Sequence, residues 1–251
     1  LWVSTRDGAL AELAWPRGTT SWRAEEIDAV GVCALGHDLL VTHRHGRVAR
    51  WSANRTVLWE LALPAKVAFA PVVHGGLVLV VDEEGGLHAL GVQDGAERFR
   101  AHLHALPAPH AASDGTLILQ ERSGELHGFD LQERSVTWTF GLEGEVYSGP
   151  AVSGGRVYAA SWAEQLVCIS LKSGDELWSR DLGSAVTASP VVAAGRVWVV
   201  TEGGTLHGFD AEDGRELARH DASRAPIQAP TLPLGGRLIV AATDGTLVAY
   251  D

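Results

Sequence analysis

The sequence predicts an all-β fold, a β-propeller built from four-stranded antiparallel blades. The first observation is a repeated unit: the stretch from Gly149 to Trp178 returns from Ser189 onward with the same order of apolar strands and glycine turns. The second is a proline column that recurs every 40 residues, at Pro150, Pro190 and Pro230. A period near 40 made only of strand and turn signals indicates units that must stack on their neighbours to bury both faces.

A third observation is a column of large apolar residues near the end of each unit. The successive gaps are 37, 40, 39 and 40 residues, and the members are Trp22, Trp59, Phe99, Trp138 and Trp178. An aromatic side chain on an outer strand can bury about 150–250 Å² against the next blade. We therefore expect these five residues to be structural and to dock one blade on the next. Ala218 interrupts the column, so the sixth blade is expected to be less firmly clamped.

The N-terminal part is expected to form three strands joined by short turns. The strands are LWVST, ALAELAW and TTSWRAE, and the turns are Asp7-Gly8 and Pro16-Arg17-Gly18. Glycine-containing turns of this kind join antiparallel strand pairs. Relative to the repeat, the first strand of this blade is missing.

From Val30 the units are complete. The second blade is expected to contain VGVCAL, DLLVTH, RVARW and TVLWEL, the third FAPVV, LVLVV, LHALG and AERFRA, and the fourth APHAA, TLILQ, ELHGFD and SVTWTF. The fifth and sixth blades are the two stretches quoted first, and the seventh, PIQAPTL, RLIVAA and TLVAYD, stops after its third strand. The expected total is 26 strands in seven blades, with six or eight blades as alternatives. A linear β-solenoid fits less well, because its repeats are shorter and contain fewer hairpins.

Composition places limits on domain number and partners. No composition break divides the chain, so residues 1–251 are expected to form a single propeller domain. A net charge of −11 argues against nucleic acid and anionic membrane surfaces as partners. The sequence has no continuous apolar run of about 18 residues, so no direct membrane insertion is expected. Because the chain has no methionine and begins in mid-strand with LWVSTR, we expect it to be a domain cut from a longer protein.

The ends of the repeats carry a family resemblance. LHGFDAEDGREL and LVCISLKSGDELW, preceded by strands such as SPVV and GRVW, resemble the PQQ-like β-propeller repeat over essentially the whole chain. The resemblance covers quinoprotein dehydrogenases, the BamB-like non-enzymatic branch of bacterial envelope assembly, and bacterial sensor or kinase-attached domains. Resemblance to the BamB-like branch implies a periplasmic or other extracytoplasmic location. The WD repeat is a weaker match, because Gly36-His37-Asp38 is not followed by a Trp-Asp dipeptide in any unit.

The enzyme branch of the resemblance implies PQQ, a Ca²⁺ ion and, in many members, a disulfide of adjacent cysteines. Cys33 and Cys168 lie too far apart in the sequence to form such a ring, and the insertions that build the cofactor pocket are absent. We therefore expect a protein that is not an enzyme, with no cofactor and no metal. The two cysteines are expected to be small buried strand residues.

Polar residues inside the repeats have a structural interpretation. His88, His127 and His207 occupy one column in three different blades. Ligands on separate blades cannot converge on one ion, so these histidines are expected to be packing residues, each held by a hydrogen bond. The acidic run Asp82-Glu83-Glu84 is expected to be a solvated turn.

Loops escape the constraint of the repeat, so unusual residues there carry more information about function. In the fifth blade, Ser161-Trp162-Ala163-Glu164 replaces the usual glycine turn, and Tyr147 enters the same blade. Aromatic residues on a polar surface are enriched among binding hot spots. The residues expected to bind a partner, all on loops of one face, are Trp162, Tyr147, Arg44, Lys66, Arg122 and Arg224. The alternatives are that Trp162 folds back as a lid and that the basic residues only aid solubility.

The expected function is a non-catalytic propeller that binds a protein or peptide, as a scaffold in bacterial envelope assembly or within a larger protein. A ligand-sensing domain of a signalling protein, such as a bacterial kinase, is the alternative. A remnant of a PQQ-dependent dehydrogenase is the third hypothesis.

Overall fold

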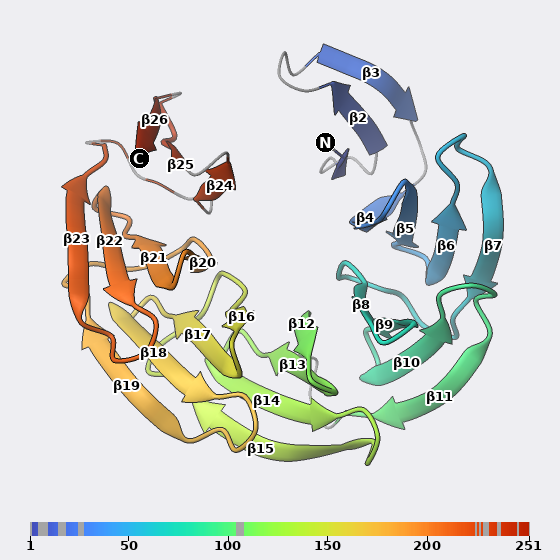
Figure 1. The fold of residues 1–251 in the computed structure, drawn as a ribbon. Coiled ribbons are helices and arrows are strands. Elements are labelled where there is room, and N and C mark those ends of the chain that lie inside the picture. The colour runs from blue at the N-terminus through green and yellow to red at the C-terminus, as the bar shows by residue number, and fades with distance from the viewer. Residues whose placement is uncertain are drawn as a thin grey trace. The chain divides into compact units, whose positions relative to one another are not determined.

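The computed structural model describes residues 2–4, 10–14, 19–24, 28–103, 108–223, 225, 227, 231–234, 237–244 and 246–250. These residues form antiparallel strands and turns, and no helix occurs among them (Figure 1). The chain divides into two compact units, Leu1–Gly115 and Thr116–Asp251, which we describe separately.

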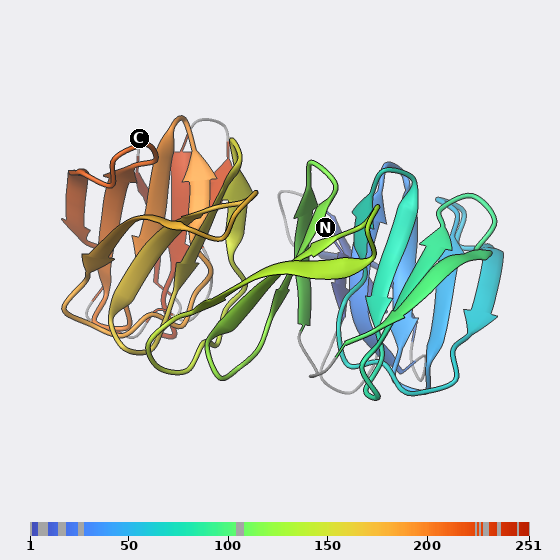
Figure 2. The same cartoon turned by 90° about the horizontal axis from the view of Figure 1, so that it is seen from below.

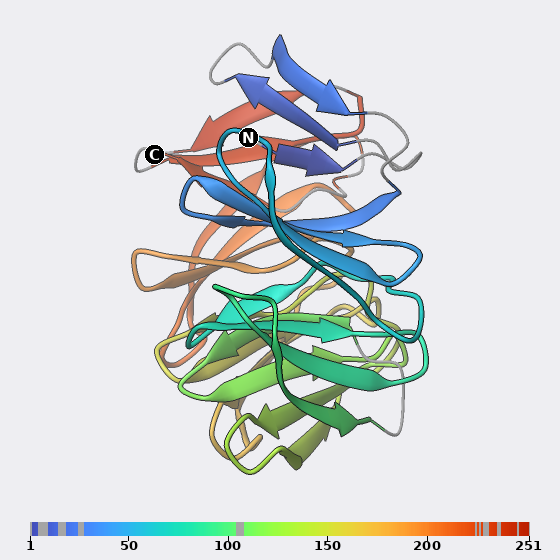
Figure 3. The same ribbon diagram turned by 90° about the vertical axis from the view of Figure 1, so that its right-hand side faces the viewer.

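Unit 1 contains three antiparallel sheets and the single strand β12 (Figure 3). Along the chain, its strands are β1 (Trp2–Ser4), β2 (Leu10–Ala14) and β3 (Thr19–Ala24); β4 (Ala29–Leu35), β5 (Asp38–His43), β6 (Arg47–Trp51) and β7 (Val57–Ala62); β8 (Val72–His74), β9 (Leu77–Val81), β10 (Gly86–Gly91) and β11 (Glu97–His102); and β12 (Ala108–Ser113). The second and third sheets pack face to face through Leu40, Val48, Val78 and Val80. Apolar residues on both faces of these strands are what such stacking requires.

Unit 2 repeats the same design (Figure 2). Its strands are β13 (Thr116–Gln120), β14 (Glu125–Asp130) and β15 (Ser135–Gly141); β16 (Ala151–Ser153), β17 (Arg156–Ala160), β18 (Gln165–Ser170) and β19 (Glu176–Asp181); β20 (Val191–Ala193), β21 (Arg196–Val200), β22 (Thr205–Asp210) and β23 (Glu216–Asp221); and β24 (Leu232–Leu234), β25 (Arg237–Ala241) and β26 (Leu247–Tyr250). Three apolar clusters fill the spaces between successive sheets.

The 26 strands of the described residues confirm the predicted strand order, and the first strand of most sheets is shorter than expected. β8, β16 and β20 have three residues each and begin directly after Pro71, Pro150 and Pro190. Proline has no N–H to give to a ladder, so it is tolerated at the start of a strand and not within it. The number of blades and the single-domain organisation stay predictions.

A bulge in each outer strand pair places the aromatic column. The register shifts after Gly128 in the pair of β14 and β15, which leaves Trp138 opposite that glycine. A Cβ atom at Gly128 would overlap the indole, and one at Gly174 would lie 2.8 Å from the ring. The indole Nε1 of Trp138 donates to the carbonyl oxygen of Leu171 at 2.9 Å. The slot for this ring is therefore formed by Gly128 of the same sheet and by Gly174 and the Leu171 carbonyl of the next sheet.

The other tryptophans of the column make the same type of contact. Trp59 Nε1 donates to the carbonyl of Val92 at 2.9 Å, and Trp178 Nε1 donates to the carbonyl of Ala211 at 3.4 Å. In each case the acceptor lies 33 residues further along the chain. Trp22 packs edge-on against Trp51, with ring centroids 6.2 Å apart.

The sheet in which Ala218 interrupts the column fills the vacant space from a different strand. Trp198 on β21 and Ala218 on β23 both pair with Gly208 on the strand between them. Trp198 is 7% exposed, and a Cβ atom at Gly208 would lie 2.6 Å from its ring. Interiors are close-packed, so a large side chain is needed somewhere in this row. Trp198 thus supplies a large ring in the row where Ala218 interrupts the column, and the expectation of a less firmly clamped sixth blade did not take this ring into account. How firmly the blade is clamped stays a prediction.

Candidate functional site

Two half-exposed aromatic side chains lie together at one end of unit 2. Tyr147 is in the connection from β15 to β16, and Trp162 is in the turn between β17 and β18. Their ring centroids are 5.6 Å apart in an edge-on arrangement, and their exposed fractions are 48% and 47%. The backbone N–H of Trp162 donates to the carbonyl of Glu145 at 2.8 Å, which holds the turn against the connection. Trp162 is thus neither a closed lid nor a freely projecting side chain.

A neighbouring turn adds charge to this pair. Arg122, between β13 and β14, places its guanidinium 4.7 Å from the centroid of the Tyr147 ring. The same guanidinium lies 3.7 Å from Glu145 Oε2, and the Tyr147 hydroxyl donates to that carboxylate. We call Arg122, Glu145, Tyr147 and Trp162 the aromatic patch. Cation–π and edge-on ring contacts pre-order these side chains before any partner arrives.

The backbone hydrogen bond that holds the aromatic patch recurs in two other described sheets, where the side chains at the same position differ. The same turn-to-connection hydrogen bond joins Glu83 to Lys66 and Glu202 to Ala185, at 2.7 Å in both cases. The position of Trp162 is therefore occupied by glutamate in those two sheets. The repeat therefore forms this turn without an aromatic side chain in those two sheets.

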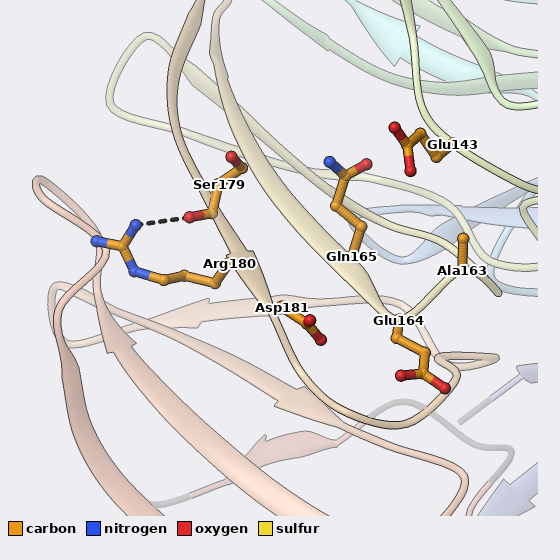
Figure 4. A pocket seen from close by; sticks show the side chains of 7 residues that line it. All are labelled: Glu143, Ala163, Glu164, Gln165, Ser179, Arg180 and Asp181. Carbon is orange, nitrogen blue, oxygen red and sulfur yellow. Dashed lines mark hydrogen bonds between the residues drawn. The ribbon is translucent and has the colours of Figure 1, made fainter.

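A shallow pocket of about 250 Å³ adjoins the aromatic patch. We call it the acidic pocket, and it is lined by Glu143, Ala163, Glu164, Gln165, Ser179, Arg180 and Asp181 (Figure 4). Arg180 turns its guanidinium away from the carboxylates, because Nε donates to the Gly214 carbonyl at 2.7 Å and Nη2 to the Asp213 carbonyl at 2.8 Å. The pocket therefore presents mainly carboxylate oxygens.

The structure brings together only some of the predicted binding residues. Tyr147, Trp162 and Arg122 form one cluster in unit 2. Arg44, in the turn after β5, and Lys66, between β7 and β8, are exposed residues of unit 1. Arg224 lies outside the described residues. That all of them share one binding surface stays a prediction.

The histidine column is hydrogen-bonded as predicted. His88 Nε2 lies 2.8 Å from Asp82 Oδ2, and its Nδ1 lies 2.7 Å from Glu97 Oε1. His127 lies 2.9 Å from a carboxylate oxygen of Glu121, and His207 bonds Glu216 at the same distance. Each ring is thus bound within its own blade.

The expectation of a solvated acidic turn was wrong for Asp82, which is fully buried. Burial alone would raise the pKa of Asp82, but hydrogen bonds from His88 and from the backbone N–H groups of Gly86 and Glu84 outweigh it and hold the pKa below its usual value. A run of three acidic residues gave no sign that the first would point inward onto a histidine of the next strand.

Other side chains that could bind a metal ion or take part in redox chemistry have structural roles in the described residues. Glu121, Glu125 and His127 place ligand atoms within 4.8 Å of one another, but both His127 nitrogens are within hydrogen-bonding distance of protein oxygens. Cys168 is buried, as predicted, and burial raises the pKa of its thiol to about 12. Cys33 is half-buried, and both cysteines are free thiols. The raised pKa keeps the Cys168 thiol protonated near neutral pH, and a protonated thiol is a poor nucleophile.

Comparisons with known proteins agree with this fold. A family model described as outer membrane protein assembly factor BamB matches residues 6–138 and again residues 122–251. Curated relatives of that description include one from Nitrosomonas eutropha, 24% identical over 70% of this chain and 48% of its own length, and one from Moranella endobia, 27% identical over 57% and 42%. The chain thus spans less than half the length of these two relatives.

A solved structure gives the same result. The crystal structure of BamB from Moraxella catarrhalis superposes with a TM-score of 0.73 at 18% identity, covering 100% of this chain and 81% of that one. At this identity the likeness shows the fold, a β-propeller of antiparallel blades. Among the described residues, no helix is long and apolar enough to cross a membrane.

Proposed function

Because the chain belongs to the PQQ-like propeller family whose model is described as outer membrane protein assembly factor BamB, we propose that it is a non-catalytic scaffold that binds a protein partner in the bacterial envelope. The curated relatives carry the same description of an assembly factor, which supports this choice over the other branches of the family. The ligand-sensing domain and the dehydrogenase remnant stay predictions.

The aromatic patch is the observation that carries the proposal. Exposed aromatic rings supply much of the binding energy of protein interfaces, where tryptophan, tyrosine and arginine are the commonest hot-spot residues. Here Tyr147 contacts both Trp162 and Arg122, and the rings of Tyr147 and Trp162 remain half exposed. A pre-ordered patch of this kind loses little side-chain entropy when a partner covers it.

Replacing Trp162 by alanine is expected to abolish most partner binding without affecting the fold. The immobilised chain would be incubated with envelope extract of its native host, and the retained proteins would be quantified by mass spectrometry. Loss of a hot-spot tryptophan costs about 2 kcal/mol or more, so we expect at least a 30-fold fall in affinity for the specific partner.

Leu177 provides the matched control, because it lies on β19 of the same sheet and is 48% exposed. Leu177→Ala should retain the partner at the wild-type level, and both variants should melt within a few degrees of the wild type. Equal retention by the wild type and Trp162→Ala would remove the aromatic patch as the binding surface.

A further inference from the structure

The turn that carries Trp162 departs from the repeat at a second position. Four described sheets have all four of their strands within one unit. In each of them the fourth residue of this turn has positive φ, and in three of the four that residue is glycine. The glycines are Gly46, Gly85 and Gly204, with φ of +85°, +81° and +87°, whereas Glu164 has φ of +64°. Left-handed backbone costs free energy for any residue with a Cβ atom. Among the six non-glycine residues of the described chain that have positive φ, Glu164 is the one that replaces the glycine of this turn and lines the pocket.

The side chain of Glu164 contributes to the acidic pocket. It lines the pocket with Glu143 and Asp181, and Figure 4 shows the side chains of all three. Asp181 Oδ1 accepts a hydrogen bond from the Gly183 N–H at 2.8 Å. Glu143 and Glu164 make no side-chain hydrogen bond or ion pair with any residue that the structure describes. Neither carboxylate is therefore engaged by another side chain of the described residues.

Most of the free polar groups of the pocket are acceptors, and the Gln165 amide offers an acceptor oxygen together with its N–H donors. Besides the carboxylates, Gln165 Oε1 is buried and has no hydrogen-bond partner in the described part of the chain. The donors of Arg180 are used by backbone carbonyls, as described above. A ligand that fits must carry positive charge and several N–H donors. Arginine and lysine side chains offer donors only, and the planar guanidinium matches carboxylates in two-point contacts.

The acidic pocket and the aromatic patch are built on the same turn and the same connection. Ala163 of the pocket directly follows Trp162, and Glu143 of the pocket lies two residues before Glu145 of the patch. We propose that the acidic pocket binds an arginine or lysine side chain of the partner, while a neighbouring apolar side chain of the same segment packs on Trp162. This proposal rests on the proposed function and specifies the chemistry of the partner, a basic and apolar peptide segment. The net charge of −11 favours its approach.

Two fluorescent probe peptides test the proposal with the whole 251-residue chain. One alternates arginine and leucine, and the other carries uncharged citrulline in place of each arginine. Affinity would be measured by fluorescence anisotropy at low salt and at about 0.5 M NaCl. We expect the arginine peptide to bind at least ten-fold more tightly at low salt, and the difference to shrink at high salt because exposed charges are screened.

Glu164→Gly is the decisive variant, because it removes the carboxylate and restores the residue that the repeat uses. It should lower the affinity for the arginine peptide at least five-fold, while the melting temperature of the protein stays the same or rises. Glu202→Gln, in the corresponding turn of the β20–β23 sheet, removes one negative charge outside the pocket and should leave the affinity unchanged. Equal binding of the two peptides, or unchanged affinity in Glu164→Gly, would overturn the proposal.

The outcomes separate this proposal from the proposed function. If Trp162→Ala loses the partner but Glu164→Gly binds the arginine peptide as tightly as the wild type, the scaffold function stands and the basic-segment proposal falls. If peptide affinity depends on Glu164 but capture is unchanged in Trp162→Ala, the pocket stands and the proposed role of the aromatic patch falls.

Discussion

Replacement of Trp138 by alanine is expected to lower the free energy of unfolding by about 3–5 kcal/mol. The side chain is 7% exposed and fills a slot whose walls include Gly128 and Gly174. Glycines have no side chain that could move into the vacated space, so the cavity should persist and the loss should fall near the upper end of this range. The carbonyl of Leu171 would also lose its donor. Urea denaturation followed by circular dichroism measures the effect.

Two further variants separate the contributions of the indole N–H and of burial to the stabilising effect of Trp138. Trp138→Phe keeps most of the ring but removes the indole N–H, so it should cost about 1–3 kcal/mol. Trp162→Ala removes the same chemical group from a half-exposed site and should change stability by less than about 1 kcal/mol. If the losses from Trp138→Ala and Trp162→Ala were equal, the aromatic column would not be what joins neighbouring sheets.

His88→Ala is expected to lower the free energy of unfolding by a comparable amount. The main cause is the loss of a partner of a buried carboxylate, and not the cavity that the ring leaves. His88 is 1% exposed and bridges the buried carboxylate of Asp82 and that of Glu97. Without the ring, Asp82 keeps its backbone donors and Arg100, whose Nη2 lies 3.7 Å from Oδ2, but it loses the hydrogen bond to His88. Removing one partner of a buried pair costs about 3–5 kcal/mol. His127→Ala is the matched control in the same column, and its partner Glu121 is only partly buried, so a smaller loss is expected.

The pH dependence of His88→Ala distinguishes charge from packing. In the wild type the pKa of Asp82 is lowered in the folded chain, so its carboxylate contributes stability that is fully present above about pH 4 and is lost as the pH falls through its folded-state pKa. In the variant, burial without the histidine should raise the pKa of Asp82. The stability difference between the two proteins should therefore be largest at pH 7 and shrink toward pH 4. A difference that is constant with pH would assign the loss to packing.

The strand pattern was predictable because its signals are local. Short apolar runs between glycine turns specify strands and hairpins without knowledge of distant residues, and 26 strands appear in the predicted order. The errors arose where a partner on another strand decides the outcome. Asp82 is buried because His88 faces it across the sheet, and Trp198 fills the row of Ala218 because both oppose Gly208. Neither relation is visible in a linear repeat.

The candidate site was predictable in part for a related reason. Trp162 and Tyr147 stood out because they break the repeat, and the contact between their rings followed from the backbone bond of the turn to Glu145. The acidic pocket was not predicted. Glu164 occupies a glycine position, which the sequence shows, but the carboxylates of Glu143 and Asp181 come from separate connections that only the folded sheet brings together.

Photocrosslinking at position 162 tests the central claim, that the aromatic patch contacts a protein partner. A photoreactive amino acid would replace Trp162 in the protein expressed in its native host, and a second protein would carry it at Leu177, a similarly exposed position of the same sheet. We predict one discrete adduct of a single protein from position 162 and none from position 177. No adduct at position 162, or adducts of equal yield at both positions, would contradict the claim.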